Sequence, residues 1–201
     1  MTTDLRPDIR LVAAHPNWAE SRVNRRLAEA ARALPRVELL DLYGRYPDYA
    51  IDVPREQAAL ADKRLLVLLH PVHWYALPAL AKLWIDEVFS HGWAYGHDGT
   101  ALQGKDFWLV ASTGGPAESY RPEGYNRFGF EAFLPPLVQT ANLCGMRFLP
   151  PQVIHGAHRL DEAALEAEVA RFTARLATYP DWPDIDACRD GCWADVPAAD
   201  R

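Results

Sequence analysis

Three separated segments contain residue types that could bind a phosphate group and a flat ring. The first, HPNWAESRVN (15–24), ends with Ser21 and Asn24 and opens a helical pattern with no acid before Glu29. The basic side chains of its first turn are Arg22, Arg25 and Arg26. Because a helix N-terminus is partly positive, arginines there indicate that an external anion fills the position. An ordinary Ser21-capped helix with solvated arginines explains the segment equally well.

The second and third segments offer flat rings and open backbone. HPVHWY (70–75) places Trp74 and Tyr75 directly after an apolar run, and STGGPAESY (112–120) contains a glycine pair. A glycine loop lets backbone N–H groups come close to a polar ring edge. Taken alone, the second segment favours rings packed under the following helix, and the third is a common strand-to-helix turn.

The pattern of the whole chain would bring these segments together. Short apolar runs alternate five times with helical patterns, which predicts a parallel sheet covered on both faces. The expected strands are 9–16, 37–43, 64–71, 106–115 and 147–156, the last interrupted by prolines. The expected helices are 21–34, 54–63, 77–89, 127–144 (which Pro135 and Pro136 must kink or split) and 161–179. Five strands favour a doubly wound sandwich of order 2-1-3-4-5, in which the loops after strands one, three and four meet.

A phosphate site, an aromatic wall and a glycine loop at one sheet edge indicate a phosphorylated flat heterocycle, for which FMN is favoured over FAD. No G-x-G-x-x-G follows the first strand, so a nicotinamide cofactor would visit rather than reside. GTALQGKD (99–106) has P-loop spacing, but Asp106 replaces the required Ser or Thr and the segment precedes a strand. Cys188 and Cys192 lack a second ligand pair close in sequence, so we expect no metal site.

Bulk composition narrows the class of protein. The 201 residues carry a formal net charge of −6 without an isolated basic cluster, which argues against nucleic-acid binding. The N-terminal residues do not resemble a signal peptide, and three cysteines without framework spacing favour a reducing cytoplasm. We expect one domain over residues 1–179 and a tail over 180–201 that wraps the surface or stays loose.

With these segments in view, the sequence resembles the flavodoxin-like NAD(P)H:quinone oxidoreductases. Within them it is most similar to the ancillary oxidoreductase subunits of glutathione-regulated potassium-efflux systems. The similarity extends over residues 8–178. The matching segments are AHP (14–16) with Ser21 and Asn24, YPDYAIDVPREQAAL (46–60), HPVHWYALPALAKLWIDEVFSHGWAYG (70–96), TGG (113–115) and ESYR (118–121).

The resemblance implies a flavodoxin-like three-layer α/β sandwich with one FMN, NAD(P)H as co-substrate and two-electron ping-pong hydride transfer to quinones or related electrophiles. It implies a cytoplasmic homodimer with the flavin sites at its interface, and it allows peripheral contact with a membrane potassium/proton antiporter. By position, the phosphate would be held by His15, Ser21, Arg22, Val23 and Asn24. The ring would be lined by Val72, His73, Trp74, Tyr75, Ser112, Thr113, Gly114 and Gly115.

The resemblance also implies catalytic residues, with two departures. Tyr120 matches the active-site tyrosine of the quinone reductases, but Asn126 stands where mammalian-type enzymes have a histidine, with Tyr125 adjacent as a partial substitute. His73 replaces a common glutamine and could hydrogen-bond the developing hydroquinone or merely tie down the strand end. A regulatory subunit without turnover and a one-electron carrier are the alternative functions.

The loop HGWAYGHDG (91–99) bears on the dimer. Trp93 and Tyr95 lie between glycines in a polar stretch, and exposed aromatic residues often mark an interface. Packing onto the protein's own core is the alternative, and the resemblance favours a dimer with this loop near the partner's flavin.

Overall fold

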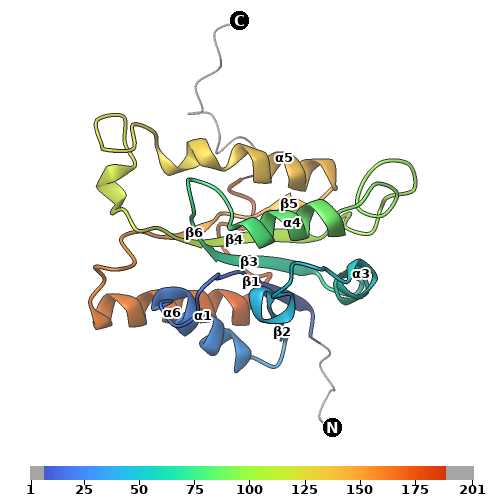
Figure 1. Cartoon of the computed structure of the whole chain (residues 1–201), viewed down its shortest axis with the longest axis horizontal. Helices are drawn as coiled ribbons and strands as arrows, with labels where there is room; N and C mark the ends of the chain where they lie inside the picture. Colours follow the sequence, from blue (N-terminus) through green and yellow to red (C-terminus); the bar gives the residue numbers. More distant parts are fainter. Residues whose placement is uncertain (1–6, 189–201) are drawn as a thin grey trace, which may run out of the picture.

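Six parallel strands form one sheet, and helices cover both of its faces in the computed structural model (Figure 1). The structure describes residues 7–188. The strand order is β2-β1-β3-β4-β5, with β6 also paired to β4, so the predicted order is confirmed. The strands are β1 Ile9–Ala13, β2 Val37–Asp41, β3 Leu65–Pro71, β4 Asp106–Ser112, β5 Arg147–Phe148 and β6 Gln152–Ile154.

The helices lie in two layers on opposite faces of the sheet (Figure 1). Along β1, Leu11 packs into the core beside α1 and α6, whereas Val12 packs into the core that contains Trp84 of α4. Burial of both faces explains why the central strands read as continuous apolar runs rather than alternating ones. The helices are α1 Val23–Arg32, α2 Leu42–Arg45, α3 Val53–Ala61, α4 Ala79–Val88, α5 Pro135–Leu143 and α6 Glu162–Thr178, with 3₁₀ turns η1 Ala117–Ser119 and η2 Phe130–Phe133.

Prolines divide two of the predicted elements, as expected. The segment 147–156 forms β5 and β6, which pair with opposite ends of β4 on either side of the Pro150–Pro151 break. The segment 127–144 becomes η2 followed by α5, which starts at Pro135 because a missing N–H is tolerated in a first helical turn.

Among the predicted element boundaries that differ from the structure, two are set by acidic side chains that cap a helix earlier than the apolar pattern indicates. The strand predicted to reach residue 43 ends at Asp41, whose carboxylate accepts a hydrogen bond from the Gly44 N–H at 3.0 Å and starts α2. The helix predicted from residue 54 starts at Val53, after Asp52.

The first part of the predicted tail packs against the domain. Trp182 is buried and stacks edge-on against Trp108 of β4, with ring centroids 4.9 Å apart. Its indole N–H donates to the Arg175 carbonyl at 2.8 Å. Packing therefore continues beyond the predicted domain end at residue 179, and the tail after residue 188 lies outside the described residues.

Candidate functional site

A cavity of about 320 Å³ lies at the carboxyl end of the sheet, where the loops after β1, β3 and β4 meet. The strand order reverses direction between β1 and β3, and ligands of doubly wound sheets bind at this kind of crevice. The predicted site residues that line the cavity are His15, Ser21, Arg22, Val23, Asn24, Val72, His73, Ser112, Thr113 and Gly114. The three chemically suggestive segments thus form one concave site.

Two buried side chains fix the start of α1 at this cavity. The Asn24 amide donates to the Ser112 hydroxyl at 3.1 Å, which ties the first loop to the third. Ser21 is not the cap residue expected: α1 begins at Val23 after Arg22, and the Ser21 hydroxyl accepts from the Arg25 N–H at 3.1 Å. Within residues 7–188, the buried Asn24 Oδ1 atom has no hydrogen-bond partner, so an acceptor is available beside the helix N-terminus.

The arginines of α1 serve a different purpose from the one first suggested by their position. Arg26 forms ion pairs with Glu162 and Glu166 of α6, and Arg22 bonds the Leu160 carbonyl and Glu162. These pairs hold the guanidinium groups against α6, and the Glu162 pKa is lowered by its hydrogen bonds to Arg26 and Arg22. An anion at the helix start would therefore meet backbone N–H groups more directly than free arginine charge.

A tight turn presents the aromatic residues after β3. His73 and Ala76 exchange two backbone hydrogen bonds of 3.1 and 3.0 Å, and Trp74 and Tyr75 between them have φ of 49° and 63°. Trp74 is 94% exposed, and neither ring faces the 320 Å³ cavity. The Tyr75 ring stacks on Phe133 at 5.0 Å between centroids. The backbone of His73 thus ties down the turn, while its imidazole lines the cavity with no hydrogen-bond partner among the described residues.

The glycine loop is anchored from below by β6. The Thr113 N–H donates to the Ile154 carbonyl at 2.9 Å, and the Ala157 N–H donates to the Thr113 carbonyl at 2.8 Å. In the described part of the chain, the N–H groups of Gly114 and Gly115 make no hydrogen bond. These two donors are available to a ligand, as the sequence indicated, although only Gly114 lines the cavity.

Tyr120 lies behind this loop rather than in the cavity wall. Its ring is half-buried among aromatic neighbours, with centroids 5.6 Å from Phe130 and 5.0 Å from His155. Burial raises the pKa of the Tyr120 phenol, and its hydrogen bond with the Thr113 hydroxyl opposes that rise. At neutral pH the phenol is therefore protonated and can act as a proton donor.

Neither residue considered as a substitute for the absent histidine is placed as a partner of Tyr120. Tyr125 is 89% exposed, and the Asn126 side-chain carbonyl accepts from the Tyr75 hydroxyl at 3.1 Å. The histidine beside Tyr120 is His155, which the sequence analysis missed, as it missed His158 in the cavity wall. His155 directly follows β6 and His158 lies in the same loop, so their position after the carboxyl edge of the last strand was the available signal.

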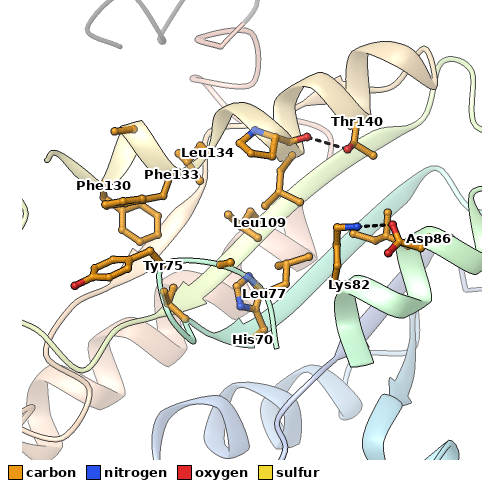
Figure 2. A pocket seen from close by; sticks show the side chains of 16 residues that line it. His70, Tyr75, Leu77, Lys82, Asp86, Leu109, Phe130, Phe133, Leu134 and Thr140 are labelled. Atoms are coloured by element: carbon orange, nitrogen blue, oxygen red, sulfur yellow. Dashed lines mark hydrogen bonds and ion pairs between the residues drawn. The ribbon is translucent and has the colours of Figure 1, made fainter. Parts of the chain in front are cut away.

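A second cavity, of about 400 Å³, lies between the 72–77 turn, α4 and α5 (Figure 2). Its wall is mostly apolar, with Leu109 and Leu134 among the lining side chains and Lys82 paired to Asp86 near α4. Val72 borders both cavities, so the turn after β3 separates them.

The described residues contain no group of three or more His, Cys, Asp or Glu side chains that could hold a metal ion. The helices within residues 7–188 are too short or too polar to cross a membrane. Trp93 and Tyr95, considered as interface residues, are half-buried and pack against the core of their own chain. Exposed rings in the described segments after β3 and β4 belong to Trp74, Tyr75, Tyr125 and Phe128.

Comparison with known proteins places this geometry in context. The family described as having a flavodoxin-like fold matches residues 8–176. A curated relative, the glutathione-regulated potassium-efflux system ancillary protein KefF of Citrobacter koseri, is 43% identical over 171 residues, which cover 85% of this chain and 96% of the relative.

Three solved structures share the fold over nearly their whole length. General stress protein 14 of Treponema denticola, solved in complex with FMN, is 35% identical with a TM-score of 0.79, covering 85% of this chain and 98% of that one. An NADPH-quinone reductase from P. pentosaceus is 26% identical with a TM-score of 0.76, covering 85% and 98%. A chain described as a thermophilic tryptophan halogenase from Streptomycin violaceusniger is 38% identical with a TM-score of 0.80, covering 83% and 97%.

Proposed function

Because this chain belongs to the family with the flavodoxin-like fold, we propose that it is an FMN-dependent NAD(P)H oxidoreductase that reduces quinones or related electrophiles. The cavity at the sheet edge supports this proposal most directly, since it joins a helix N-terminus, an open glycine loop and a buried unpartnered acceptor. The FMN bound by the general stress protein and the quinone reductase activity named for the P. pentosaceus protein agree with it.

The residues present fit FMN. The phosphate would bind at the start of α1, held by His15, Ser21, Arg22, Val23 and Asn24. The unpartnered Asn24 Oδ1 atom can only accept a hydrogen bond, which suits a hydroxyl of the ribityl chain. The ring would lie along the loops that contain Val72, His73, Trp74, Tyr75, Ser112, Thr113, Gly114 and Gly115, with the glycine N–H groups at its polar edge.

When bound, FMN would supply two-electron hydride chemistry between NAD(P)H and an acceptor, and the two substrates would occupy the same place in turn. The N–H groups of Gly114 and Gly115 would stabilise negative charge at the ring edge, as oxyanion-type donors do. Tyr120, protonated at neutral pH, would donate to the reduced acceptor oxygen. The unpartnered His73 imidazole would be a second donor near the acceptor.

The same proposal includes a homodimer in the cytoplasm. The rings of Trp74 and Tyr125 are almost fully exposed, and that of Phe128 is about half exposed, which favours a partner surface there. The similarity to KefF, an ancillary protein of a potassium-efflux system, supports a peripheral contact with a membrane potassium/proton antiporter.

The absorption spectrum of the purified protein, followed by anaerobic NADPH titration, tests the function. We expect a yellow protein whose flavin absorbance is bleached by NADPH and restored by a quinone. Its NADPH consumption should not depend on added halide or tryptophan, which a tryptophan halogenase would need. Colourless protein that takes up no FMN would refute every flavin-based function. A flavin that no nicotinamide reduces would favour a one-electron carrier, and flavin bound without turnover, in a complex with the antiporter, would favour the regulatory subunit.

Two substitutions separate binding from chemistry. Tyr120→Phe should slow stopped-flow reoxidation by quinone about a hundredfold while FMN affinity stays near wild type, because only the proton donor is lost. Unchanged reoxidation would remove Tyr120 from the mechanism.

Ser21→Asp keeps an acceptor for the Arg25 N–H but adds negative charge, so FMN affinity should fall about tenfold or more while riboflavin affinity changes little.

A further inference from the structure

We propose that His158, in the loop after β6, supplies the positive charge with which the cavity at the sheet edge selects a phosphorylated flavin over an unphosphorylated one. This inference rests on the proposed FMN-dependent function and deepens it by naming what recognises the phosphate charge. His158 is a binding residue in this scheme, since no step of the reduction passes through it.

The cavity of about 320 Å³ fits the phosphate and ribityl end of the ligand. Its wall contains residues 20–24 at the start of α1, whereas Trp74, Tyr75 and Gly115, which were assigned to the ring, do not line it. His158 lies in the same wall. A charge on its imidazole would therefore act on the phosphate end of the ligand.

The arginines beside the cavity have their charge balanced by α6. Arg22 lines the wall, but its guanidinium pairs with Glu162 at 3.2 Å. Arg26 pairs with the same Glu162 and with Glu166, so two arginines face two glutamates. Glu20, which also lines the cavity, adds a negative charge. Without a protonated imidazole, these groups carry no net positive charge for a phosphate dianion.

Two other imidazoles line the cavity and are less suited to carry this charge. The His15 Nδ1 atom accepts from the Asn17 N–H at 3.1 Å, so protonation there would break a hydrogen bond. Burial lowers the pKa of His15, and the charge of His73 lowers it further. A charge on His73 would face both His15 and the buried His70. His158 is exposed and makes no hydrogen bond or ion pair within residues 7–188.

The backbone holds His158 between the glycine loop and α1. On one side, the Ala157 N–H donates at 2.8 Å to the carbonyl that precedes Gly114. On the other side, the Arg22 guanidinium bonds the Leu160 carbonyl. A Cβ atom placed on Gly114 would lie 3.8 Å from His158 Cδ2, so the ring stands beside the glycine loop at an ordinary van der Waals distance. The imidazole is thus positioned by both walls of the cavity.

Protonation of His158 and binding of a phosphate would reinforce one another. A dianion beside an imidazole favours the charged form of the ring, and the charged ring donates hydrogen bonds from both nitrogens. An unphosphorylated flavin offers no such charge, so the gain is confined to FMN. The charged and titratable side chains that share the wall with His158 are Glu20, Arg22, His15 and His73, and its neighbour in the chain is Arg159.

Flavin titrations of the full-length chain, freed of bound flavin, test this role through the quenching of flavin fluorescence. His158→Gln keeps a side-chain donor but no charge, so FMN affinity at pH 7 should fall about tenfold while riboflavin affinity stays within about twofold of wild type. His158→Arg keeps the charge and should bind FMN within about threefold of wild type. His97→Gln, at a side chain that is 92% exposed and outside the cavity, is the control and should leave both affinities unchanged.

The pH dependence separates the charge of His158 from its packing. An imidazole loses its charge as the pH rises through neutrality, whereas a phosphate monoester is mostly a dianion above about pH 6.5. Wild-type FMN affinity should therefore fall between pH 6.5 and 8.5. His158→Gln should lose most of this dependence, and His158→Arg should retain its FMN affinity at pH 8.5. Riboflavin affinity should change little with pH in all three proteins.

The outcomes distinguish this inference from the function on which it rests. Equal losses of FMN and riboflavin affinity in His158→Gln, unchanged FMN affinity in that variant, or His158→Arg that binds FMN no better than His158→Gln would each overturn the role of His158 and leave the reductase function standing. Wild-type protein that binds FMN but is not reduced by NADPH would overturn the reductase function alone. Wild-type protein that takes up neither flavin would overturn both.

Discussion

His70 makes the stability of this protein sensitive to acid. Its side chain is buried at the end of β3, and its Nδ1–H donates to the Pro71 carbonyl at 2.9 Å. Burial lowers the pKa of this imidazole from 6.5 to about 4, and the neighbouring His73 charge adds to the decrease. The folded state therefore holds His70 neutral over a range in which the unfolded chain binds a proton.

The magnitude follows from linkage between proton binding and folding. Above pH 6.5 both states hold a neutral imidazole and the free energy of unfolding is unaffected. As the pH falls from 6.5 to about 4, the unfolded chain gains a proton that the folded protein excludes, and stability is lost at about 1.4 kcal/mol per pH unit. The decrease in pKa thus corresponds to about 3 kcal/mol, fully lost below pH 4.

Urea unfolding of wild type and His70→Phe between pH 7.5 and 4 measures this effect. The phenylalanine ring fills the same space and cannot be protonated, so the variant should gain about 3 kcal/mol relative to wild type between pH 7 and pH 4. His97→Gln, at a side chain that is 92% exposed, is the control and should follow the wild-type curve. Parallel curves for wild type and His70→Phe would refute the assignment of this acid sensitivity to His70.

Three further substitutions, and one control variant, test the packing and the site. Glu56→Ala should destabilise the protein by about 3–5 kcal/mol in urea unfolding, because it removes the buried carboxylate that contacts Arg10 at 2.9 Å and accepts from the Tyr46 hydroxyl at 2.7 Å, leaving Arg10 with Glu38 alone. Glu166→Ala, at an exposed pair, should change stability by less than about 1 kcal/mol. Trp182→Ala should cost about 3 kcal/mol and lower the melting temperature, whereas a wild-type melting temperature would mean that this part of the tail contributes no stability. Asn24→Leu removes the Oδ1 acceptor and should weaken riboflavin and FMN binding alike in isothermal titration, and unchanged riboflavin binding would argue against a ribityl contact at this side chain.

The sequence was sufficient for the sheet order because apolar runs and helical periods are local signals. β1 and β3 are recognisable as buried strands, and the helix that became α5 could be divided at Pro135 from the chemistry of proline alone. The convergence of the three loops followed from the strand order, without any knowledge of side-chain direction.

The errors concern contacts between residues far apart in the chain. Arg22 and Arg26 looked free until α6 brought Glu162 and Glu166 beside them, more than a hundred residues away in sequence. His155 lacked a motif of its own, since its importance depends on Thr113 and Tyr120 lying next to it in space. Periodicity and spacing cannot encode such pairings, because they arise only when β4 and β6 lie side by side.

The turn after β3 carries a conformational cost that packing within the described chain offsets only in part. Two consecutive residues with side chains adopt left-handed backbone, which costs each of them about 1 kcal/mol relative to glycine. The Trp74 ring gains little packing energy within its own chain to offset this cost, because it is almost wholly exposed to solvent. Glycine at position 74 would remove this backbone cost and give a more stable monomer. The most exposed ring near the site thus lies on a backbone conformation that side chains rarely adopt.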